Sequence, residues 1–159
     1  MNQIAQPLQP GSAVPDFQIR IQDGSERTLA HYKGKKWALY FYPKDMTPGC
    51  TTQACNLSEH FDKLSAAGVG ILGVSPDDEK KHIKFIEKYG LRIDLACDED
   101  LKLHQLLGVW GLKKFMGKEY EGTHRTTFLI NEEGIIHAVI SKPNTKDHAA
   151  EILNGFGLK

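Results

Sequence analysis

Residues 36–50, KWALYFYPKDMTPGC, decide how this chain folds around one cysteine. The first seven residues are apolar almost without alternation, which is typical of a β-strand covered on both faces. Pro43 ends that strand, Thr47 has the chemistry of a helix N-cap, and Pro48 suits the first helical position. The stretch therefore predicts a buried strand, a short loop and a helix whose first turn carries Cys50.

The expected position of Cys50 favours a reactive thiol. Near the third helical position, the helix dipole and unpaired backbone N–H groups stabilise a negative charge. The thiolate, not the thiol, is the nucleophile in cysteine chemistry. A polar, cramped Thr-Pro-Gly-Cys turn is also unlike the apolar surroundings of an inert structural cysteine. We therefore expect a redox site at Cys50, with Cys55 as a second thiol on the same helix.

Length and charge narrow the class of protein. The chain has 159 residues, which suits a single domain over residues 1–159. Lysine plus arginine and aspartate plus glutamate both number 20, so nothing suggests nucleic acid or an anionic membrane as a partner. No apolar run approaches the ~18 residues of a membrane span, and no secretory signal is visible. We expect residues 1–12 to form a mobile tail.

The three cysteines indicate reduced thiols. A secreted disulfide scaffold is usually shorter and richer in cysteine, so a cytoplasmic protein is the simpler interpretation. In such a protein a Cys-x4-Cys pair is catalytic or metal-binding rather than a permanent staple. A zinc site would need a second cysteine pair, and the histidines show no ligand spacing, so we expect no metal. His60 and His82 fit exposed helical positions.

The rest of the chain alternates between strand and helix patterns. The expected elements are a hairpin over 17–21 and 26–29, a helix over 48–67, a strand over 69–74, a helix from 75–78 to Gly90, a strand over 93–97, a helix over 98–107, a loop over 109–123, a hairpin over 126–131 and 135–141, and a helix over 145–156. A βαβ core followed by a hairpin and a helix resembles the thioredoxin fold. The predicted class is therefore α/β, with a central mixed sheet flanked by helices and an N-terminal β-hairpin.

Several ungapped motifs carry a resemblance to a known family. The pattern Pro-x-x-x-Thr-x-x-Cys, at Pro43, Thr47 and Cys50, resembles the active-site signature of the peroxiredoxins. Residues 41–55 resemble the Q-type branch, also called the bacterioferritin comigratory proteins. The resemblance continues through 108–111, 115–118 and 124–130, and it covers the chain from about Gly11 to the end.

The resemblance implies a thiol peroxidase with Cys50 as its nucleophile. The thiolate attacks one peroxide oxygen and becomes a sulfenic acid, while negative charge grows on the leaving oxygen. The backbone N–H groups of Gly49 and Cys50, the hydroxyl of Thr47 and the side chain of Arg125 would stabilise that charge. Thr47 can be a plain N-cap as well. Taken alone, Arg125 would be read as an exposed strand residue.

Cys55 is the candidate resolving thiol, and its spacing raises a geometric problem. Five residues on an α-helix separate Cα atoms by roughly 8.7 Å, whereas a disulfide tolerates about 6.8 Å. The first turns must therefore unwind before the two sulfurs can bond. Gly49, Thr51 and Thr52 have weak helix propensity, which makes this segment easy to unwind. The alternative is that Cys55 is simply a small apolar residue on the helix.

Two other positions bear on resolution. Cys97 follows an apolar pair at the end of an expected strand, so core packing is its expected role, with resolution of Cys50 as the alternative. Some Q-type members resolve through a cysteine on the next helix. That position aligns with Ile86 in this chain, which closes that route.

The resemblance also implies the substrate contacts. Pro43, Gly49, Gln53 and Tyr42 are the candidate substrate-binding residues. Gln53 would hydrogen-bond near Arg125, although an exposed helical glutamine explains it equally well. Tyr42 is either a pocket wall or a core residue.

The implied reaction needs no cofactor. Its partners would be hydrogen peroxide and small organic hydroperoxides, with thioredoxin or glutaredoxin as reductant, in a monomer. A protein disulfide oxidoreductase is a competing hypothesis, but it would be expected to carry Cys-x-x-Cys. A redox sensor or holdase that uses the same cysteine is a third hypothesis, and a fast reaction with peroxide would separate the peroxidase from the other two.

Overall fold

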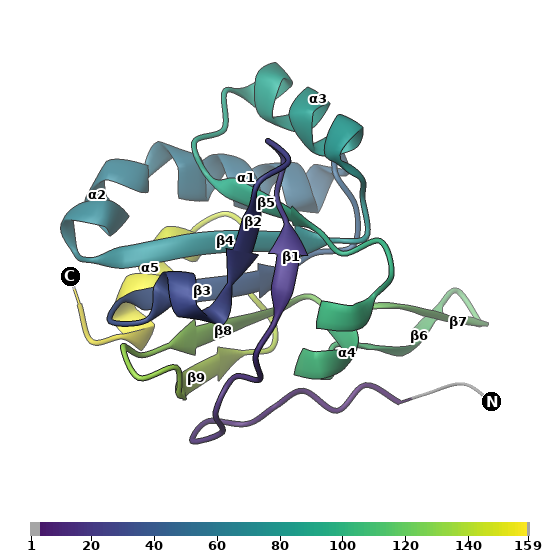
Figure 1. Cartoon of the computed structure of the whole chain (residues 1–159). Coiled ribbons are helices and arrows are strands. Elements are labelled where there is room, and N and C mark those ends of the chain that lie inside the picture. Colours follow the sequence, from purple (N-terminus) through teal and green to yellow (C-terminus); the bar gives the residue numbers. More distant parts are fainter. Residues whose placement is uncertain (1–3, 159) are drawn as a thin grey trace.

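A five-stranded mixed sheet forms the middle layer of the molecule in the computed structural model, which describes residues 4–158 except for the side chain of Phe115 (Figure 1). The strand order is β5 (Asp94–Cys97), β4 (Val69–Ser75), β3 (Lys36–Phe41), β8 (Thr126–Ile130) and β9 (Ile136–Ile140). Strands β3, β4 and β5 run parallel, and β8 and β9 add antiparallel strands at the other edge. This arrangement confirms the predicted α/β class.

Both faces of the sheet are covered, which explains why β3 is apolar throughout. Trp37, Leu39 and Phe41 point into one buried cluster, and Ala38 and Tyr40 point into the other. The second cluster is covered by α1 (Pro48–Glu59), α2 (Phe61–Ala66), α3 (Glu79–Tyr89) and α5 (His148–Gly155). The first is covered by the N-terminal segment, the hairpin β1 (Gln18–Arg20) and β2 (Glu26–Thr28), the 3-10 helix η1 (Leu29–Tyr32) and α4 (Lys102–Leu107).

A glycine makes room for the aromatic ring that lies under the start of α1. Gly73 on β4 stands in register with Tyr40 on β3. A Cβ atom at Gly73 would lie 2.8 Å from the Tyr40 ring and hydroxyl and 2.9 Å from Leu95. Any side chain at Gly73 would therefore displace Tyr40 from beneath α1.

Three predicted helices differ from the observed ones at their ends. The helix predicted over 48–67 breaks at His60, whose φ of −100° and ψ of 17° separate α1 from α2. The helix predicted from residue 98 begins only at Lys102, because Leu101 has a left-handed backbone with φ 62°. The last helix begins at His148 rather than at 145. The predicted strands and the two hairpins are confirmed within a residue or two.

The loop predicted over 109–123 is wrong. These residues form a two-stranded antiparallel ribbon of β6 (Trp110–Phe115) and β7 (Lys118–Thr123), which projects from the body (Figure 1). Met116 and Gly117 both have positive φ, 52° and 80°, as a tight hairpin turn between twisted strands requires. Most of β7 is exposed, so no apolar alternation marked the ribbon in the sequence.

The N-terminal segment lies along the body of the protein. The Leu8 N–H donates to the Leu107 carbonyl at 3.1 Å, and the Gly11 N–H donates to the Ile136 carbonyl at 2.8 Å. Residues 1–3 of the predicted mobile tail lie outside the described residues, so the mobility of 1–12 stays a prediction.

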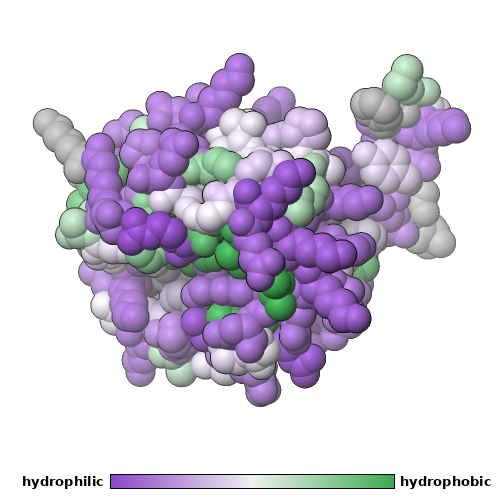
Figure 2. Space-filling view, turned by 90° about the horizontal axis from the view of Figure 1, so that it is seen from above, coloured by the Kyte–Doolittle hydropathy of each residue, from purple (hydrophilic) through white to green (hydrophobic). Residues whose placement is uncertain are grey.

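The outer surface near α3 and α1 is mostly polar. Seen from the top of Figure 1, this face is largely hydrophilic, with a narrow hydrophobic strip between polar side chains (Figure 2). Between residues 4 and 158, no helix is long and apolar enough to cross a membrane.

Candidate active site

The sheet register brings the two parts of the site together. Cys50 is the third residue of α1, which follows β3 after the loop 43–47. Strands β3 and β8 are antiparallel, and Phe41 at the end of β3 pairs with Thr126 at the start of β8. Arg125, one residue before β8, therefore lies beside the loop that leads into α1. The side chain of Cys50 is almost wholly buried.

Arg125 contacts the sulfur directly. Its Nη2 donates to Cys50 Sγ at 3.0 Å, and its Nη1 donates to Gln53 Oε1 at 2.6 Å. Gln53 is fully buried, so the alternative of an exposed glutamine is wrong. Two hydrogen bonds from one rigid guanidinium fix its position and place a permanent cation on the sulfur. A cation and a helix N-terminus both favour the thiolate at Cys50.

Gly49 lies directly beneath this guanidinium. A Cβ atom built at Gly49 would lie 3.5 Å from Arg125 Nη2. The helix begins at Pro48, so the N–H groups of Gly49 and Cys50 have no acceptor four residues earlier within α1. Both groups are available to a negative charge that develops near the sulfur.

Thr47 is the N-cap residue by backbone position, with φ −81° and ψ 153°. Its side chain does not cap the helix; Oγ1 donates to the carbonyl of Lys44 at 2.8 Å. A hydroxyl whose proton is committed in this way still offers lone pairs to a second donor. Thr47 is therefore set to accept a hydrogen bond rather than to donate one.

A buried hydrogen-bond network holds the loop 43–47 from below. Asp45 accepts from the Tyr42 hydroxyl at 2.6 Å and lies 2.6 Å from His82 Nδ1, and its backbone N–H donates to Asp77 at 2.8 Å. Asp77 accepts from the Ser75 hydroxyl as well. Loop, strand β4 and helix α3 are thus joined through carboxylates. The prediction that His82 is exposed is wrong, since its ring is fully buried. The carboxylate of Asp45 beside Nδ1 offsets the free-energy cost of burying this polar ring.

This network also contains one group with metal-ligand geometry. Donor atoms of Asp45, Asp77 and His82 lie within 4.8 Å of one another. Each of these side chains already has a hydrogen-bonding partner, including the Ala96 carbonyl at 2.9 Å from His82 Nε2. We therefore interpret the three residues as a structural network rather than a metal site.

Tyr40 is a site residue that sequence reasoning missed. Its hydroxyl is buried without a hydrogen-bond partner in the described structure, as is Nε2 of Gln53. Burial, followed by the nearby charge of Cys50, raises the pKa of Tyr40 well above its usual value, so the phenol keeps its proton. Tyr42, predicted to contact substrate, is buried and committed to Asp45 instead. The signal was available, since alternation along β3 puts both tyrosines on the face that carries Cys50.

Cys55 has different surroundings on the same helix. It is partly exposed, and burial and the charge of Glu59 raise the pKa of its thiol. Helix α1 is unbroken between Cys50 and Cys55, and both thiols are free, so the Cα separation of roughly 8.7 Å stands. The next residue, Asn56, donates to the Lys146 carbonyl at 3.0 Å and accepts from the Ala149 N–H at 2.8 Å. Unwinding α1 this far would therefore loosen α5.

A thioredoxin-like sheet with a buried cysteine, a helix start and an arginine on one sulfur defines a thiol-based redox enzyme. Comparison with known proteins narrows this class. Residues 10–139 match the AhpC/TSA family. The putative peroxiredoxin Bcp of Haemophilus influenzae is 46% identical over 148 residues, covering 93% of this chain and 96% of the relative. The peroxiredoxin Bcp of Bacillus subtilis is 45% identical over 146 residues, covering 92% and 93%.

Solved structures agree with the sequence relatives. Peroxiredoxin Q of Xanthomonas campestris superposes with a TM-score of 0.84 at 33% identity, covering 96% of each chain. The chain therefore belongs to the AhpC/TSA family, in the peroxiredoxin Q or bacterioferritin comigratory branch. It is a peroxiredoxin, a thiol-dependent peroxidase.

Proposed function

We propose that Cys50 is the peroxidatic cysteine for hydrogen peroxide and small organic hydroperoxides, with Arg125, Thr47 and the first turn of α1 as its catalytic setting. The contact of 3.0 Å between Arg125 Nη2 and Cys50 Sγ carries this proposal. It puts a cation where both the attacking thiolate and the leaving oxygen are negative. The bacterioferritin comigratory protein of Xanthomonas campestris, a neighbour at 32% identity, is described for its alkyl peroxide reduction activity, which supports the organic substrates.

The first step transfers one oxygen to sulfur. The Cys50 thiolate attacks the nearer oxygen of ROOH, the S–O bond forms and the O–O bond breaks, and the products are Cys50 sulfenic acid and RO⁻. Water returns a proton to give ROH. Thr47 Oγ1, whose proton is committed to Lys44, accepts the hydrogen bond from the peroxide O–H. Arg125 and the N–H groups of Gly49 and Cys50 hold the leaving oxygen.

Tyr40, Gln53 and Pro43 shape the rest of the site. The hydroxyl of Tyr40 and Nε2 of Gln53 are buried donors without a partner among the described residues, as is Oγ1 of Thr51 on α1. Gln53 also fixes the guanidinium of Arg125 through its other atom. Pro43 is half-buried at the start of the loop and restricts its path.

The second step joins Cys55 to Cys50. The Cys55 thiol gives up its proton, its sulfur attacks the sulfenic sulfur, the S–S bond forms as the S–OH bond breaks, and the departing hydroxide takes up a proton and leaves as water. The separation within α1 requires the first turns to unwind before this bond can close. Position 86, where a resolving cysteine would lie on α3, holds Ile86 packed in the cluster of Cys50. Cys55 is therefore the proposed resolving residue of an atypical two-cysteine enzyme.

The cycle closes by dithiol exchange with thioredoxin or glutaredoxin. An unwound segment that carries the disulfide is accessible to a protein reductant, and such a reductant requires a reducing compartment, which supports the cytoplasm. We propose a monomer, since every element of the site comes from one chain.

Peptide mapping after one equivalent of peroxide tests the proposal directly. The expected product is a Cys50–Cys55 disulfide, with Cys97 still alkylated as a free thiol. A dominant Cys50–Cys97 bond would reject Cys55 as the resolving residue. Oxidation that spares Cys50 would reject the site itself.

A further inference from the structure

Asn56, the residue after Cys55, joins helix α1 to the start of helix α5. Its Nδ2 donates to the Lys146 carbonyl at 3.0 Å, and its Oδ1 accepts from the Ala149 N–H at 2.8 Å. Ala149 is the second residue of α5, so its N–H has no acceptor four residues earlier within that helix. The side chain of Asn56 therefore does for α5 what an N-cap residue normally does for its own helix.

The residue at the N-cap position of α5 does not make this hydrogen bond itself. Asp147 holds that position by its backbone, with φ −145° and ψ 42°, but its side chain makes no capping hydrogen bond. The two helices also share one buried cluster, in which Ala54 and Leu57 of α1 lie with Ile152 of α5. Helix α5 thus holds α1 in place at Asn56, through packing and through two hydrogen bonds.

Asn56 lies where an opening of α1 would have to stop. Leu57 is fully buried, and the Ser58 hydroxyl accepts from the Arg92 N–H at 2.8 Å, so the helix beyond Asn56 is anchored to the body of the protein. The preceding segment 49–55 carries both thiols, and its glycine and threonines have weak helix propensity. Asn56 is therefore at the boundary between the part of α1 that must unwind and the part that stays wound.

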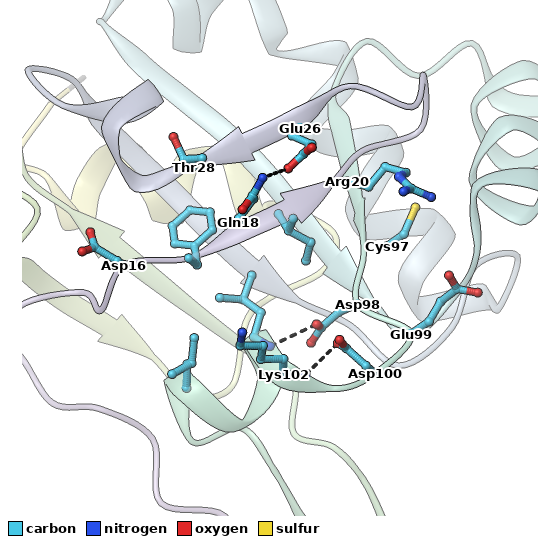
Figure 3. A pocket seen from close by; sticks show the side chains of 14 residues that line it. Asp16, Gln18, Arg20, Glu26, Thr28, Cys97, Asp98, Glu99, Asp100 and Lys102 are labelled. Carbon is cyan, nitrogen blue, oxygen red and sulfur yellow. Dashed lines mark hydrogen bonds between the residues drawn. The ribbon is translucent and has the colours of Figure 1, made fainter.

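The third thiol lies away from this boundary. Cys97 ends β5 at the edge of the sheet, and β4 separates that strand from β3, which leads into α1. Cys97 is partly exposed and lines a pocket of about 740 Å³ between the hairpin β1–β2 and the turn from β5 into α4 (Figure 3). It belongs to neither core cluster, so the prediction of core packing is wrong. Within α1, access of a second thiol to Cys50 depends on how readily the helix opens at Cys55.

We propose that Asn56 is a positioning residue for the resolution step, because its two hydrogen bonds to α5 hold Cys55 in the wound helix and limit the rate of disulfide closure. This inference rests on the proposed role of Cys55 as the resolving thiol. Both bonds are present in the folded helix and would break as it unwinds, so they stabilise only the state in which the disulfide cannot close.

A slow closure prolongs the life of the sulfenic acid on Cys50. Its sulfur can then attack a second ROOH. An S–O bond forms as the O–O bond breaks, and the products are a sulfinic acid and ROH. The hydrogen bonds of Asn56 would therefore also set how much Cys50 is lost to sulfinic acid when peroxide is abundant.

Asn56→Ala tests the inference, because it removes both hydrogen bonds and leaves the groups around Cys50 in place. Closure after one equivalent of peroxide is followed by rapid quench, alkylation of free thiols and intact mass. We expect closure to accelerate about fivefold to tenfold, which is the scale of losing a helix cap. Oxidation of Cys50 should keep its rate, and the yield of sulfinic acid at high peroxide should fall. General damage to the fold would not accelerate one step and spare the other.

Asn131→Ala is the matched control. The side chain of Asn131 accepts from the N–H groups of Glu133 and Ile135, both at 3.0 Å, in the turn between β8 and β9. Its loss also removes two side-chain bonds to the backbone, but it should leave closure at the wild-type rate. Asn56→Asp keeps an acceptor for the Ala149 N–H, so its closure rate should lie closer to wild type than that of Asn56→Ala. This comparison is made at a pH where closure has levelled off, so that the added charge does not change the ionisation of the thiol.

The outcomes separate this inference from the proposed function. If the Cys50–Cys55 disulfide forms but closes at the wild-type rate in Asn56→Ala, the helix opens without disturbing Asn56, and this inference alone is overturned. Equal acceleration in Asn131→Ala would also overturn it, since loss of stability anywhere in the fold would then have the same effect. If the wild-type chain forms no Cys50–Cys55 disulfide, the proposed resolving role of Cys55 and this inference both fail.

Discussion

Cys50 and Cys55 lie on one helix, five residues apart, and their surroundings are opposite. Cys50 is buried at the first turn, where Arg125 donates to its sulfur at 3.0 Å. Cys55 lies further along α1, partly exposed, where burial and the nearby carboxylate of Glu59 raise the pKa of its thiol. One thiol is surrounded by groups that stabilise negative charge, and the other is next to a group that opposes it.

In the proposed mechanism, this difference separates attack by Cys50 from resolution by Cys55. The helix start would hold the geometry for peroxide attack in the folded state, so that step should need no rearrangement. The same helix keeps the second thiol about 2 Å beyond disulfide reach and mostly protonated. The folded state thus favours the sulfenic acid, and resolution requires the helix to open.

Exchanging each cysteine for serine gives the largest expected effect. Cys50→Ser should abolish peroxide consumption, because the nucleophile is lost. Cys55→Ser should retain one fast turnover per chain and then stop, because the sulfenic acid has no partner. Pre-steady-state and steady-state peroxide assays distinguish these outcomes. Substantial turnover by Cys50→Ser would remove the basis of the comparison.

Arg125→Ala comes next in size. Removing one group that stabilises transition-state charge costs about two orders of magnitude or more in rate. Stopped-flow oxidation of Cys50 should therefore slow by about that factor, while disulfide closure after oxidation changes little. Arg92→Ala is the matched control, since Arg92 forms an exposed ion pair with Asp62 that does not involve the residues of the candidate site. A change within about threefold in Arg125→Ala would reject the role of the cation.

The sequence predicted the position of Cys50 in the helix well because the determinants of that position are local. Strand, loop and helix signals around Pro43, Thr47 and Pro48 place Cys50 at the third helical position, where the structure has it. Arg125 lies 75 residues away, and only the family resemblance connected it to Cys50. The β3–β8 register that joins them is a long-range pairing, which no local pattern encodes.

The errors share a physical cause. His82 was read as exposed because it is polar, and exposure was the alternative left open for Gln53, yet each is buried against a charged partner, Asp45 or Arg125. Buried polar pairs leave no hydrophobic periodicity to detect. The prediction of a loop over 109–123 was wrong for a similar reason, since an exposed two-stranded sheet needs no apolar face and therefore shows no hydrophobic alternation. Cys97 was assigned to the core from its apolar neighbours, although it is the last residue of β5, is partly exposed and lines an open pocket.

Hydrogen exchange should reveal the opening that resolution requires. On oxidation, amides around residues 49–56 should lose protection as Cys50 bonds Cys55, because the intact helix cannot hold that bond. Asn56 links this segment to α5, so amides near Ala149 should also exchange faster. Cys55→Ser, treated with the same peroxide, should keep its protection. A bonded pair inside an undistorted α1 would contradict the geometry.

The smallest expected effect tests the charge beside Cys55. A thiol with a raised pKa is mostly protonated near neutral pH, so disulfide closure should accelerate as pH rises toward that pKa and level off above it. Burial is the larger cause of the shift and Glu59 the smaller one, so Glu59→Gln should move the profile slightly toward lower pH. An exposed pair of this kind is worth about 0.2–0.5 kcal/mol, which corresponds to an acceleration of about twofold below the pKa and none above it.

The control for this prediction is Glu87→Gln, which changes an exposed glutamate on α3. Rapid-quench measurement of closure after a single oxidation gives both profiles. Identical profiles for Glu59→Gln and Glu87→Gln would mean that Cys55 ionises only after the helix has opened, and its surroundings within α1 would then play no part in resolution.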